Sequence, residues 1–485
     1  MLENQTNIAW DTLLPATESV TGPLHDRLRR ALRSAIVTGR LAPGSPLPPS
    51  RALAADLACS RWVVTEAYAQ LAAEGYLESR AGSATRVRLG TAATAARSTP
   101  PVPPAPPPRF DLSPGLPDLR AFPRKRWSEA MHRAGTQAAY PDFGQLDPAG
   151  HRHLRRTLAE HLVRSRGASA VPGDVTICGG TTDAVTRIAR ALRTGGVTHL
   201  AMEEPGWPAT RAAIAAAGLV PVPIDVDEHG LRVDLLREHA QVQAAIVAPN
   251  HQFPTGAVLA PDRRAALIAW ANEVDGIVLE EDKDADFRYD RRPVAAIQGM
   301  APARVALLGS LSKTLSPALR IGWFTIPPRW AAPVSAANPM ALPPPVLDQL
   351  AFASFLETGS YDRHLRASRR RYRTRRDAVI AELTRQLPHA RVSGASAGLH
   401  LLLHLDAIDT AAVVALAAKD GVRVGDLAAY RVAADPTEST LVLGYGNLAD
   451  TSVPEAISLL AKAIDLAREP APRPDTRPAL PPQSP

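Results

Sequence analysis

The sequence predicts a multidomain chain in which a small winged helix-turn-helix unit precedes a larger α/β domain. Two observations carry this prediction. Near the N-terminus, three helical patterns are followed by two short strand patterns. From residue 110 onward, short apolar runs alternate with helical stretches, a pattern typical of a mostly parallel sheet covered by helices.

Length and composition limit the class of protein. The 485 residues suffice for two or three domains with a sizeable core. No run of about 18 apolar residues exists and the first residues do not resemble a secretion signal, so we expect a cytoplasmic protein without a membrane span. The only cysteines, Cys59 and Cys178, argue against a disulfide framework, and no metal site is predicted. A net charge of +7 fits a polyanionic partner.

The first predicted domain covers residues 23–90. Apolar residues at four-residue spacing over 24–36 predict an amphipathic helix. Ser50 and Ser60 are good N-caps for the two short helices that follow. Residues 76–87 are interpreted as two strands around a Gly-Ser turn. Three helices followed by a hairpin form a winged helix-turn-helix, which places the start of its second motif helix at the DNA major groove.

This geometry selects the DNA-binding candidates. Arg61 can read a guanine edge or bind phosphate, and Thr65 can support either role. Arg51 lies at a helix start, where phosphate is favoured. Trp62 can stack on a sugar, contact a thymine methyl group or pack inside the domain. The predicted DNA-binding residues are Arg51, Ser60, Arg61, Trp62, Thr65 and Arg86.

The remaining boundaries follow from composition. Residues 1–22 form an N-terminal extension with little signal, and residues 91–110 form a linker rich in Ala, Thr and Pro with polyproline-type stiffness. The α/β domain is predicted over 111–468, its last part from about 350 forming a smaller α+β lobe, and the Pro-rich residues 469–485 form a disordered tail.

Within this domain the patterns predict individual elements. Strands are predicted at 175–178, 199–202, 244–248, 276–279, 305–308 and 322–326, and in the lobe at 399–405 and 440–443. Helices are predicted at 182–192, 209–217, 261–271, 347–355 and 363–385.

A lysine follows the predicted strand 305–308. At a strand end, Lys313 can lose solvation and become an amine nucleophile that forms a Schiff base. Ser310, Ser312 and Arg320 can hold a dianionic phosphate through hydroxyls and a guanidinium group. The alternative is a surface lysine in a polar loop. The stretch resembles the pyridoxal-phosphate lysine motif of fold-type I aminotransferases, in which the lysine carries the cofactor.

Other strand ends supply further cofactor candidates. Gly180, Thr181 and Thr182 open a helix, and their amides can grip phosphate oxygens. Trp207 can stack on a pyridine ring, His251 can bond a phenolic oxygen, and a carboxylate in the 280–282 run can pair with a protonated pyridine nitrogen. Each also has an ordinary structural interpretation: a plain turn, a core tryptophan, a loop histidine and a solvent-facing acidic strand end.

Several motifs extend the resemblance to nearly the whole chain. Residues 47–54 and 71–78 resemble the GntR-type winged-helix domain, and residues 111–118, 251–256, 287–290 and 312–315 resemble signatures of the MocR (GabR/PdxR-like) regulators. The resemblance implies a winged helix fused to a fold-type I pyridoxal-phosphate-dependent transferase domain. It also implies pyridoxal 5'-phosphate on Lys313, a phosphate held partly by Arg320, double-stranded operator DNA as partner and a head-to-tail homodimer.

Four departures from the family pattern stand out. The pyridine partner maps to Glu281 instead of aspartate, and the tyrosine that reaches the phenolic oxygen maps to Lys283, which changes the local charge. Phe253 replaces an asparagine. Around residues 441–445 no arginine is present to hold a substrate carboxylate, although Arg423 or Arg431 can substitute.

The sequence therefore favours a transcriptional regulator whose aminotransferase-like domain senses pyridoxal phosphate, or a small amine or amino acid, as an aldimine. Replacement of the lysine aldimine would remove a tether and shift the DNA-binding domains. One alternative is an active aminotransferase with an appended DNA-binding module. A second alternative is a scaffold without cofactor, which Glu281 and Lys283 suggest.

Overall fold

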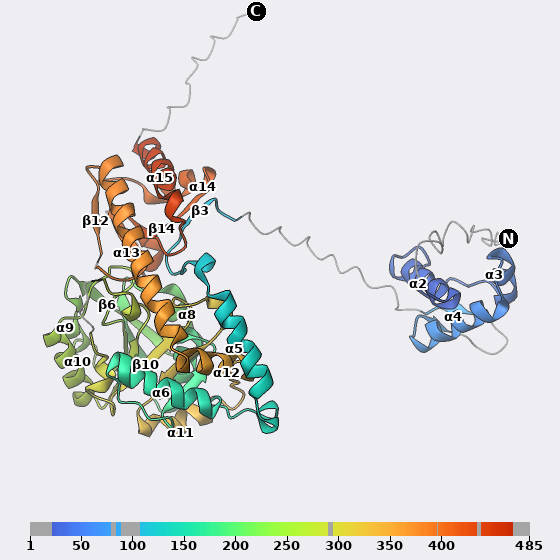
Figure 1. Ribbon diagram of the computed structural model, residues 1–485, viewed down its shortest axis with the longest axis horizontal. Coiled ribbons are helices and arrows are strands. Elements are labelled where there is room, and N and C mark those ends of the chain that lie inside the picture. Colours follow the sequence, from blue (N-terminus) through green and yellow to red (C-terminus); the bar gives the residue numbers. More distant parts are fainter. Residues whose placement is uncertain are drawn as a thin grey trace, which may run out of the picture. The chain divides into compact units, whose positions relative to one another are not determined.

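The computed structural model describes residues 22–78, 84–88, 107–289, 294–394, 396–433 and 438–468. The chain divides into two compact units, within Met1–Pro106 and Pro107–Pro485 (Figure 1). The predicted extension 1–22, the linker 91–110 and the tail 469–485 fall almost entirely outside the described residues.

The first unit is the predicted winged helix-turn-helix. The helices are α2 (Leu24–Val37), α3 (Ser50–Asp56) and α4 (Arg61–Ala73), followed by β1 (Leu77–Glu78) and β2 (Arg86–Val87). The two strands pair antiparallel with Leu77 opposite Val87. Leu32, Leu53 and Val64 come from the three helices and pack with these strand residues into one buried core. The apolar stripe predicted for the first helix therefore faces this core.

One of the two predicted helix caps is wrong. Ser60 is the N-cap residue of α4, although its side chain makes no capping hydrogen bond. Ser50 is instead the first residue of α3, and Pro49 is the N-cap with φ −53° and ψ 141°. Because the ring of a proline fixes φ near this value, Pro49 supplies the extended geometry at the helix start without a side-chain oxygen.

The second unit is built on an eight-stranded sheet. Its order is β4 (Val175–Cys178), β11 (Gly322–Thr325), β10 (Val305–Ser310), β9 (Ile277–Glu281), β8 (Val242–Val247), β5 (His199–Glu204), β6 (Val220–Asp227) and β7 (Gly230–Leu231). β11 and β7 run antiparallel to their neighbours and the other pairings are parallel. All six predicted strands of this sheet are present. β6 was missed because Pro221 and Pro223 interrupt its pattern.

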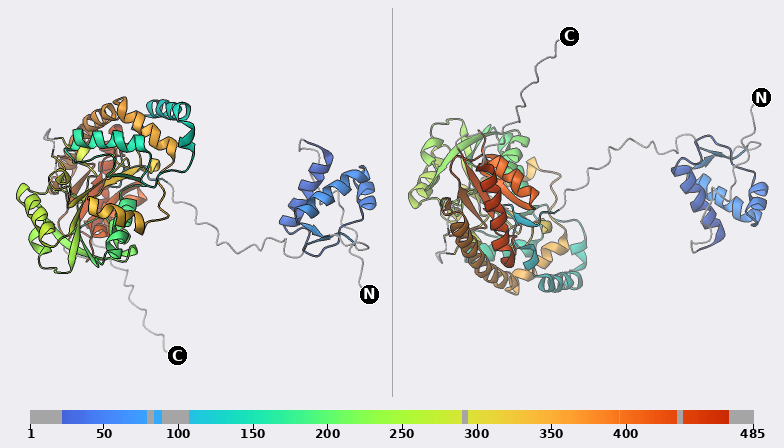
Figure 2. Two further views of the ribbon diagram at one scale, coloured as in Figure 1. Left: turned by 90° about the horizontal axis from the view of Figure 1, so that it is seen from below. Right: turned by 90° about the horizontal axis from the view of Figure 1, so that it is seen from above.

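Helices cover both faces of this sheet (Figure 2). One face packs against α7 (Thr181–Thr194), α8 (Pro208–Ala216) and α11 (Pro328–Ala337). The opposite face packs against α9 (Val233–Leu236) and α10 (Pro261–Glu273). Three further helices pack together: α5 (Arg124–Gln137), α6 (Arg152–Arg166) and α12 (Val346–Glu357).

A smaller lobe contains a five-stranded sheet. Its order is β12 (Arg391–Ser393), β13 (His400–His404), β15 (Thr440–Gly444), β14 (Val422–Asp426) and β3 (Phe110–Leu112). The lobe also holds α14 (Thr410–Lys419) and α15 (Val453–Arg468), and the long α13 (Ser360–Gln386) runs along it (Figure 1). The predicted lobe lacked β3, β12 and β14. β3 and β12 have three residues each, which is too short to show a recognisable period. Among the described helices, none is both long and apolar enough to cross a membrane.

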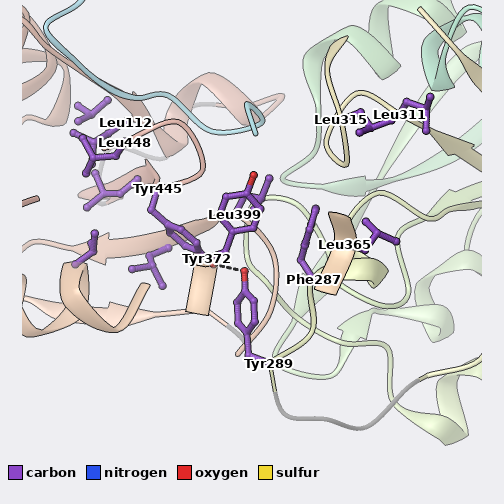
Figure 3. Packing of buried hydrophobic residues seen from close by; sticks show 14 of the residues in the cluster. Leu112, Phe287, Tyr289, Leu311, Leu315, Leu365, Tyr372, Leu399, Tyr445 and Leu448 are labelled. Atoms are coloured by element: carbon purple, nitrogen blue, oxygen red, sulfur yellow. Dashed lines mark hydrogen bonds between the residues drawn. The ribbon is translucent and has the colours of Figure 1, made fainter. Parts of the chain in front are cut away.

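One hydrophobic core joins the lobe to the large sheet. Figure 3 shows Tyr289 and Tyr445 meeting in it, with their hydroxyl oxygens 3.4 Å apart. Each of these hydroxyls also donates to the Gly398 carbonyl, at 2.6 Å. The same core contains Leu311 and Leu315, which lie on either side of Lys313 in the chain.

Candidate functional site

The large-domain candidates converge on one edge of the eight-stranded sheet. Lys313 follows β10, Glu281 ends β9, Trp207 follows β5, and Gly180 follows β4. β10, β9, β8 and β5 are consecutive parallel strands, so their carboxyl ends lie at the same edge. In open α/β sheets this edge is where ligands bind.

The loop that carries Lys313 is firmly anchored. Leu311 and Leu315 are buried in the core, at 0% and 1% exposure (Figure 3). Between them, the Thr314 hydroxyl accepts a hydrogen bond from Tyr361 Oη at 3.1 Å. The chain around Lys313 is therefore fixed by packing on both sides, while the Lys313 side chain stays 14% exposed.

A buried acid that the sequence analysis did not select pairs with Lys313. Lys313 Nζ lies 3.3 Å from Asp284 Oδ2, which also accepts a hydrogen bond from His251 Nδ1 at 3.1 Å. Burial alone would raise the pKa of Asp284, but the Lys313 ammonium and the His251 hydrogen bond hold it well below its usual range. The available signal was the acidic run 280–286, whose members could not be told apart by spacing.

His400 stands beside this network. Its Nε2 donates to the Pro254 carbonyl at 2.9 Å, and burial, followed by the neighbouring His251, lowers its pKa to about 3. His251, Asp284 and His400 place potential metal-ligand atoms within 4.8 Å of one another. The Lys313 ammonium already balances the charge of Asp284, so the geometry does not require an ion.

The neutral state of His400 makes stability depend on pH. The unfolded chain takes up a proton on this histidine near its ordinary pKa of 6.5, whereas the folded chain does so only near 3. The free energy of unfolding should therefore fall as pH drops below about 6.5, by about 2 kcal/mol per such histidine on reaching pH 5. Denaturant unfolding of the wild type and His400→Gln at pH 7 and pH 5 measures this. Between pH 7 and pH 5, the free energy of unfolding of the variant should fall by about 2 kcal/mol less than that of the wild type. Equal changes in both proteins would contradict the assignment.

Glu281 faces a small cavity at the same sheet edge. Its Oε1 lies 2.6 Å from Lys283 Nζ, and that ammonium lies 5.8 Å from the centre of the Trp207 ring. Glu281, Lys283, Trp207 and Phe253 all line the cavity, whose volume is about 20 Å³. Phe253 also lies near Lys313, whose Nζ is 5.7 Å from the centre of the Phe253 ring. The lysine therefore lies close to this cavity.

The other acids of the run are engaged elsewhere. Asp282 accepts two hydrogen bonds from Arg166, at 2.7 and 2.9 Å, and one from Asn250. Glu280 is fully buried and accepts the backbone N–H groups of Ile297 and Gln298. Glu281 is therefore the member of this strand end that remains available to the cavity.

The other end of the site suits an anion. Gly180 is the N-cap of α7 with φ 128°, so Thr181 and Thr182 open the helix. A Cβ atom built on Gly179 would lie 3.4 Å from Arg320 Nη2, which places the guanidinium group beside this helix start. In the described part of the chain the Arg320 guanidinium has no hydrogen-bond partner. Two half-buried serines precede Arg320 in the chain: Ser310 ends β10 and Ser312 lies on the loop that follows.

The DNA-binding candidates gather around the start of α4. Trp62 is 62% exposed, with its ring 5.3 Å from His25, so the alternative that it packs inside is excluded. Arg61 is exposed and its Nε donates to Ser50 Oγ at 3.2 Å. The Thr65 hydroxyl donates to the Arg61 carbonyl.

Two more predicted DNA-binding arginines lie on other elements of this unit. Arg51 is exposed in the first turn of α3. Arg86 on β2 donates to the Gly44 carbonyl at 3.0 Å.

The arginines considered for a substrate carboxylate have other surroundings. Arg431 forms an ion pair with Glu438 at 3.0 Å. Arg423 is exposed on β14, opposite Asp111 of β3. At the end of β15, Tyr445 is fully buried and directs its hydroxyl to the lobe core.

Comparison with known families agrees with this two-part architecture. Residues 24–87 match bacterial regulatory proteins of the gntR family, and residues 110–446 match aminotransferase class I and II. The fold is thus a winged helix joined to a fold-type I aminotransferase-like domain. Among solved structures, kynurenine aminotransferase from Pyrococcus horikoshii is 25% identical with a TM-score of 0.67, covering 74% of this chain and 92% of that one. A multiple substrate aminotransferase from Thermococcus profundus is also 25% identical, with a TM-score of 0.66, covering 74% of this chain and 91% of that one.

Relatives that span the whole architecture are regulators. The HTH-type pyridoxine biosynthesis transcriptional regulator PdxR of Corynebacterium glutamicum is 30% identical over 448 residues, covering 91% of this chain and 96% of the relative. The probable rhizopine catabolism regulatory protein MocR of Rhizobium meliloti is 31% identical over 467 residues, covering 91% of this chain and 94% of the relative. The chain belongs to this MocR/PdxR-type group of GntR-family transcriptional regulators.

Proposed function

We propose that this protein is a cytoplasmic transcriptional regulator that binds operator DNA through α4 and holds pyridoxal 5'-phosphate on Lys313. The observation that carries the proposal is the anchored Lys313, set at the same sheet edge as an aromatic cavity and a helix start that suits an anion. Family membership supports the DNA-binding role, and the class I and II aminotransferase fold supports the cofactor.

The residues present suit that cofactor. The amides at Gly180, Thr181 and Thr182 and the guanidinium group of Arg320 would hold its phosphate, with Ser310 and Ser312 beside them. Trp207 would stack on its ring, with Glu281 and Lys283 at the ring nitrogen and phenolic oxygen. Bound pyridoxal 5'-phosphate supplies an aldehyde carbon that accepts an amine.

Asp284 gives the amine of Lys313 a second position. In this structure the Lys313 ammonium forms an ion pair with Asp284 Oδ2, and His251 forms a hydrogen bond to the same oxygen. A small amine or amino acid that displaces Lys313 from the cofactor would leave the lysine in this ion pair. Such an effector acts as a switch only if it favours one arrangement of the lobe and sheet over the other. The surroundings of Arg431 and Tyr445 favour sensing over transamination.

On DNA, Arg61 is the side chain with the largest expected contribution. We expect Arg61→Ala to weaken specific binding by roughly 1–3 kcal/mol, because it removes a base-edge or phosphate contact in the major groove. A gel shift on the region upstream of the protein's own coding sequence measures this. Arg40→Ala, an exposed arginine outside the motif helices, is the matched control. Equal affinities of the wild type and Arg61→Ala for this DNA would show that Arg61 does not contribute to specific binding.

We further propose a head-to-tail homodimer. Among the strongly exposed large apolar side chains of the second unit, four lie in two short segments, 140–143 and 340–342: Tyr140, Phe143, Met340 and Leu342. A chain of hydrogen bonds from Asp142 through His151 and Gln349 to the Pro344 carbonyl links their two segments. An apolar group of this kind marks a contact surface. We expect Met340→Asp combined with Leu342→Asp to convert a dimer to a monomer in sedimentation velocity, whereas Val432→Asp, at another exposed apolar residue, should not. An unchanged dimer would move the interface elsewhere.

A further inference from the structure

The pair formed by Glu281 and Lys283 has a consequence for cofactor chemistry. The 2.6 Å separation of their charged atoms is that of a short charge-assisted hydrogen bond, and their side chains are only 9% and 14% exposed. The carboxylate that would otherwise meet a ring nitrogen therefore already has a cation as its partner. Because the pair is shielded from water, breaking it leaves a charge without compensation.

The other ionisable groups near the cavity do not change the charge balance between Glu281 and Lys283. Burial raises the pKa of Glu203 to about 8, so this cavity-lining acid is largely neutral at pH 7. Its carboxyl oxygen accepts the Ala248 N–H. Lys313 is paired with Asp284 rather than with Glu281. The cavity walls thus hold one negative and one positive charge, and a third ionised group would find no unpaired partner.

We propose that Lys283 neutralises Glu281, so that the protein binds pyridoxal 5'-phosphate with an unprotonated ring nitrogen. This inference rests on the proposed function and adds to it a reason for sensing without turnover. A protonated pyridine ring is a strong electron sink and an unprotonated one is much weaker. The site would keep the capture of amines by the aldehyde but lose most of the assistance to proton abstraction that transamination needs.

The test reads the ring nitrogen directly. The full-length protein is loaded with 15N-labelled pyridoxal 5'-phosphate, and its nitrogen resonance is recorded at pH 7 in the wild type, Lys283→Met, Glu281→Gln and the exposed-site control Lys419→Met. We expect the wild type, Glu281→Gln and Lys419→Met to show an unprotonated nitrogen. Lys283→Met should show a protonated one, because Glu281 is then unpaired.

A second measurement compares the affinity for pyridoxal 5'-phosphate with that for its 1-deaza analogue, in which carbon replaces the ring nitrogen. The wild type and Glu281→Gln should bind both equally. Lys283→Met should prefer the nitrogen-containing cofactor by about tenfold or more, as expected for a charge-assisted hydrogen bond. Glu281→Gln keeps the shape of the side chain, so it gives a result even if Lys283→Met folds poorly.

The outcomes separate this inference from the function on which it rests. A protonated nitrogen in the wild type, or a tenfold preference for the natural cofactor that Glu281→Gln abolishes, overturns the inference while leaving the cofactor in place. Failure of the wild type to bind either compound overturns the proposed function itself, and the inference falls with it.

Discussion

Lys313→Ala should abolish covalent capture of pyridoxal 5'-phosphate. The variant lacks the amine at the sheet edge, while the helix start at Gly180 and the Arg320 guanidinium group still offer a phosphate site. After incubation with the cofactor and reduction with borohydride, the wild type should carry a stable label on the peptide containing Lys313. The variant should carry none there and should lack the visible absorbance band of a lysine-bound cofactor.

The control distinguishes the site from general lysine chemistry. Lys419→Ala removes an exposed lysine on α14 and should leave the label and the band unchanged. Labelling of other lysines to the same extent in all three proteins, with nothing specific at Lys313, would contradict the assignment. It would leave only the DNA-binding half of the proposed function.

Arg375→Met should produce the largest loss of stability. Arg375 is 2% exposed on α13, and its Nη2 donates to Asp118 Oδ2 at 2.8 Å. It also donates to Asp450 and to the carbonyls of Tyr445 and Gly446. Removing it leaves the buried Asp118 with only Arg120 as a cation partner, at 3.0 Å, and that side chain is 52% exposed, so we expect a loss of about 3–5 kcal/mol. The pair with Asp450 contributes little to this figure because that carboxylate is 62% exposed.

Denaturant unfolding of the full chain measures this effect. Arg373→Met, an exposed position on the same helix, should change the free energy of unfolding by no more than about 0.5 kcal/mol. Adding Asp118→Asn to Arg375→Met should recover part of the loss, because the buried charge that has lost its buried partner is removed as well. If the single and double variants were equally unstable, the cost would come from lost packing rather than from the buried charge.

The sequence by itself determined the two-part architecture. Turn and capping signals around Pro48, Ser60 and Gly75 separate short helices, and apolar runs alternating with helical periods predict a parallel sheet. Lys313 could also be selected in this way, because a strand followed by small hydroxyl residues and a lysine is a local pattern. These features depend on residues that are close together in the chain, so one stretch of sequence contains the whole signal.

Only the tertiary structure decided which partner each acidic residue of the site pairs with. The run 280–284 contains four acids, and only the fold assigns Glu280 to backbone amides, Asp282 to Arg166, Glu281 to Lys283 and Asp284 to Lys313. Three of these partners are remote in sequence, and the direction of each side chain depends on how β9 sits between β8 and β10. Local spacing carries no information about such neighbours, because the energy of a buried charge is set by whichever partner the packing brings within a few ångströms.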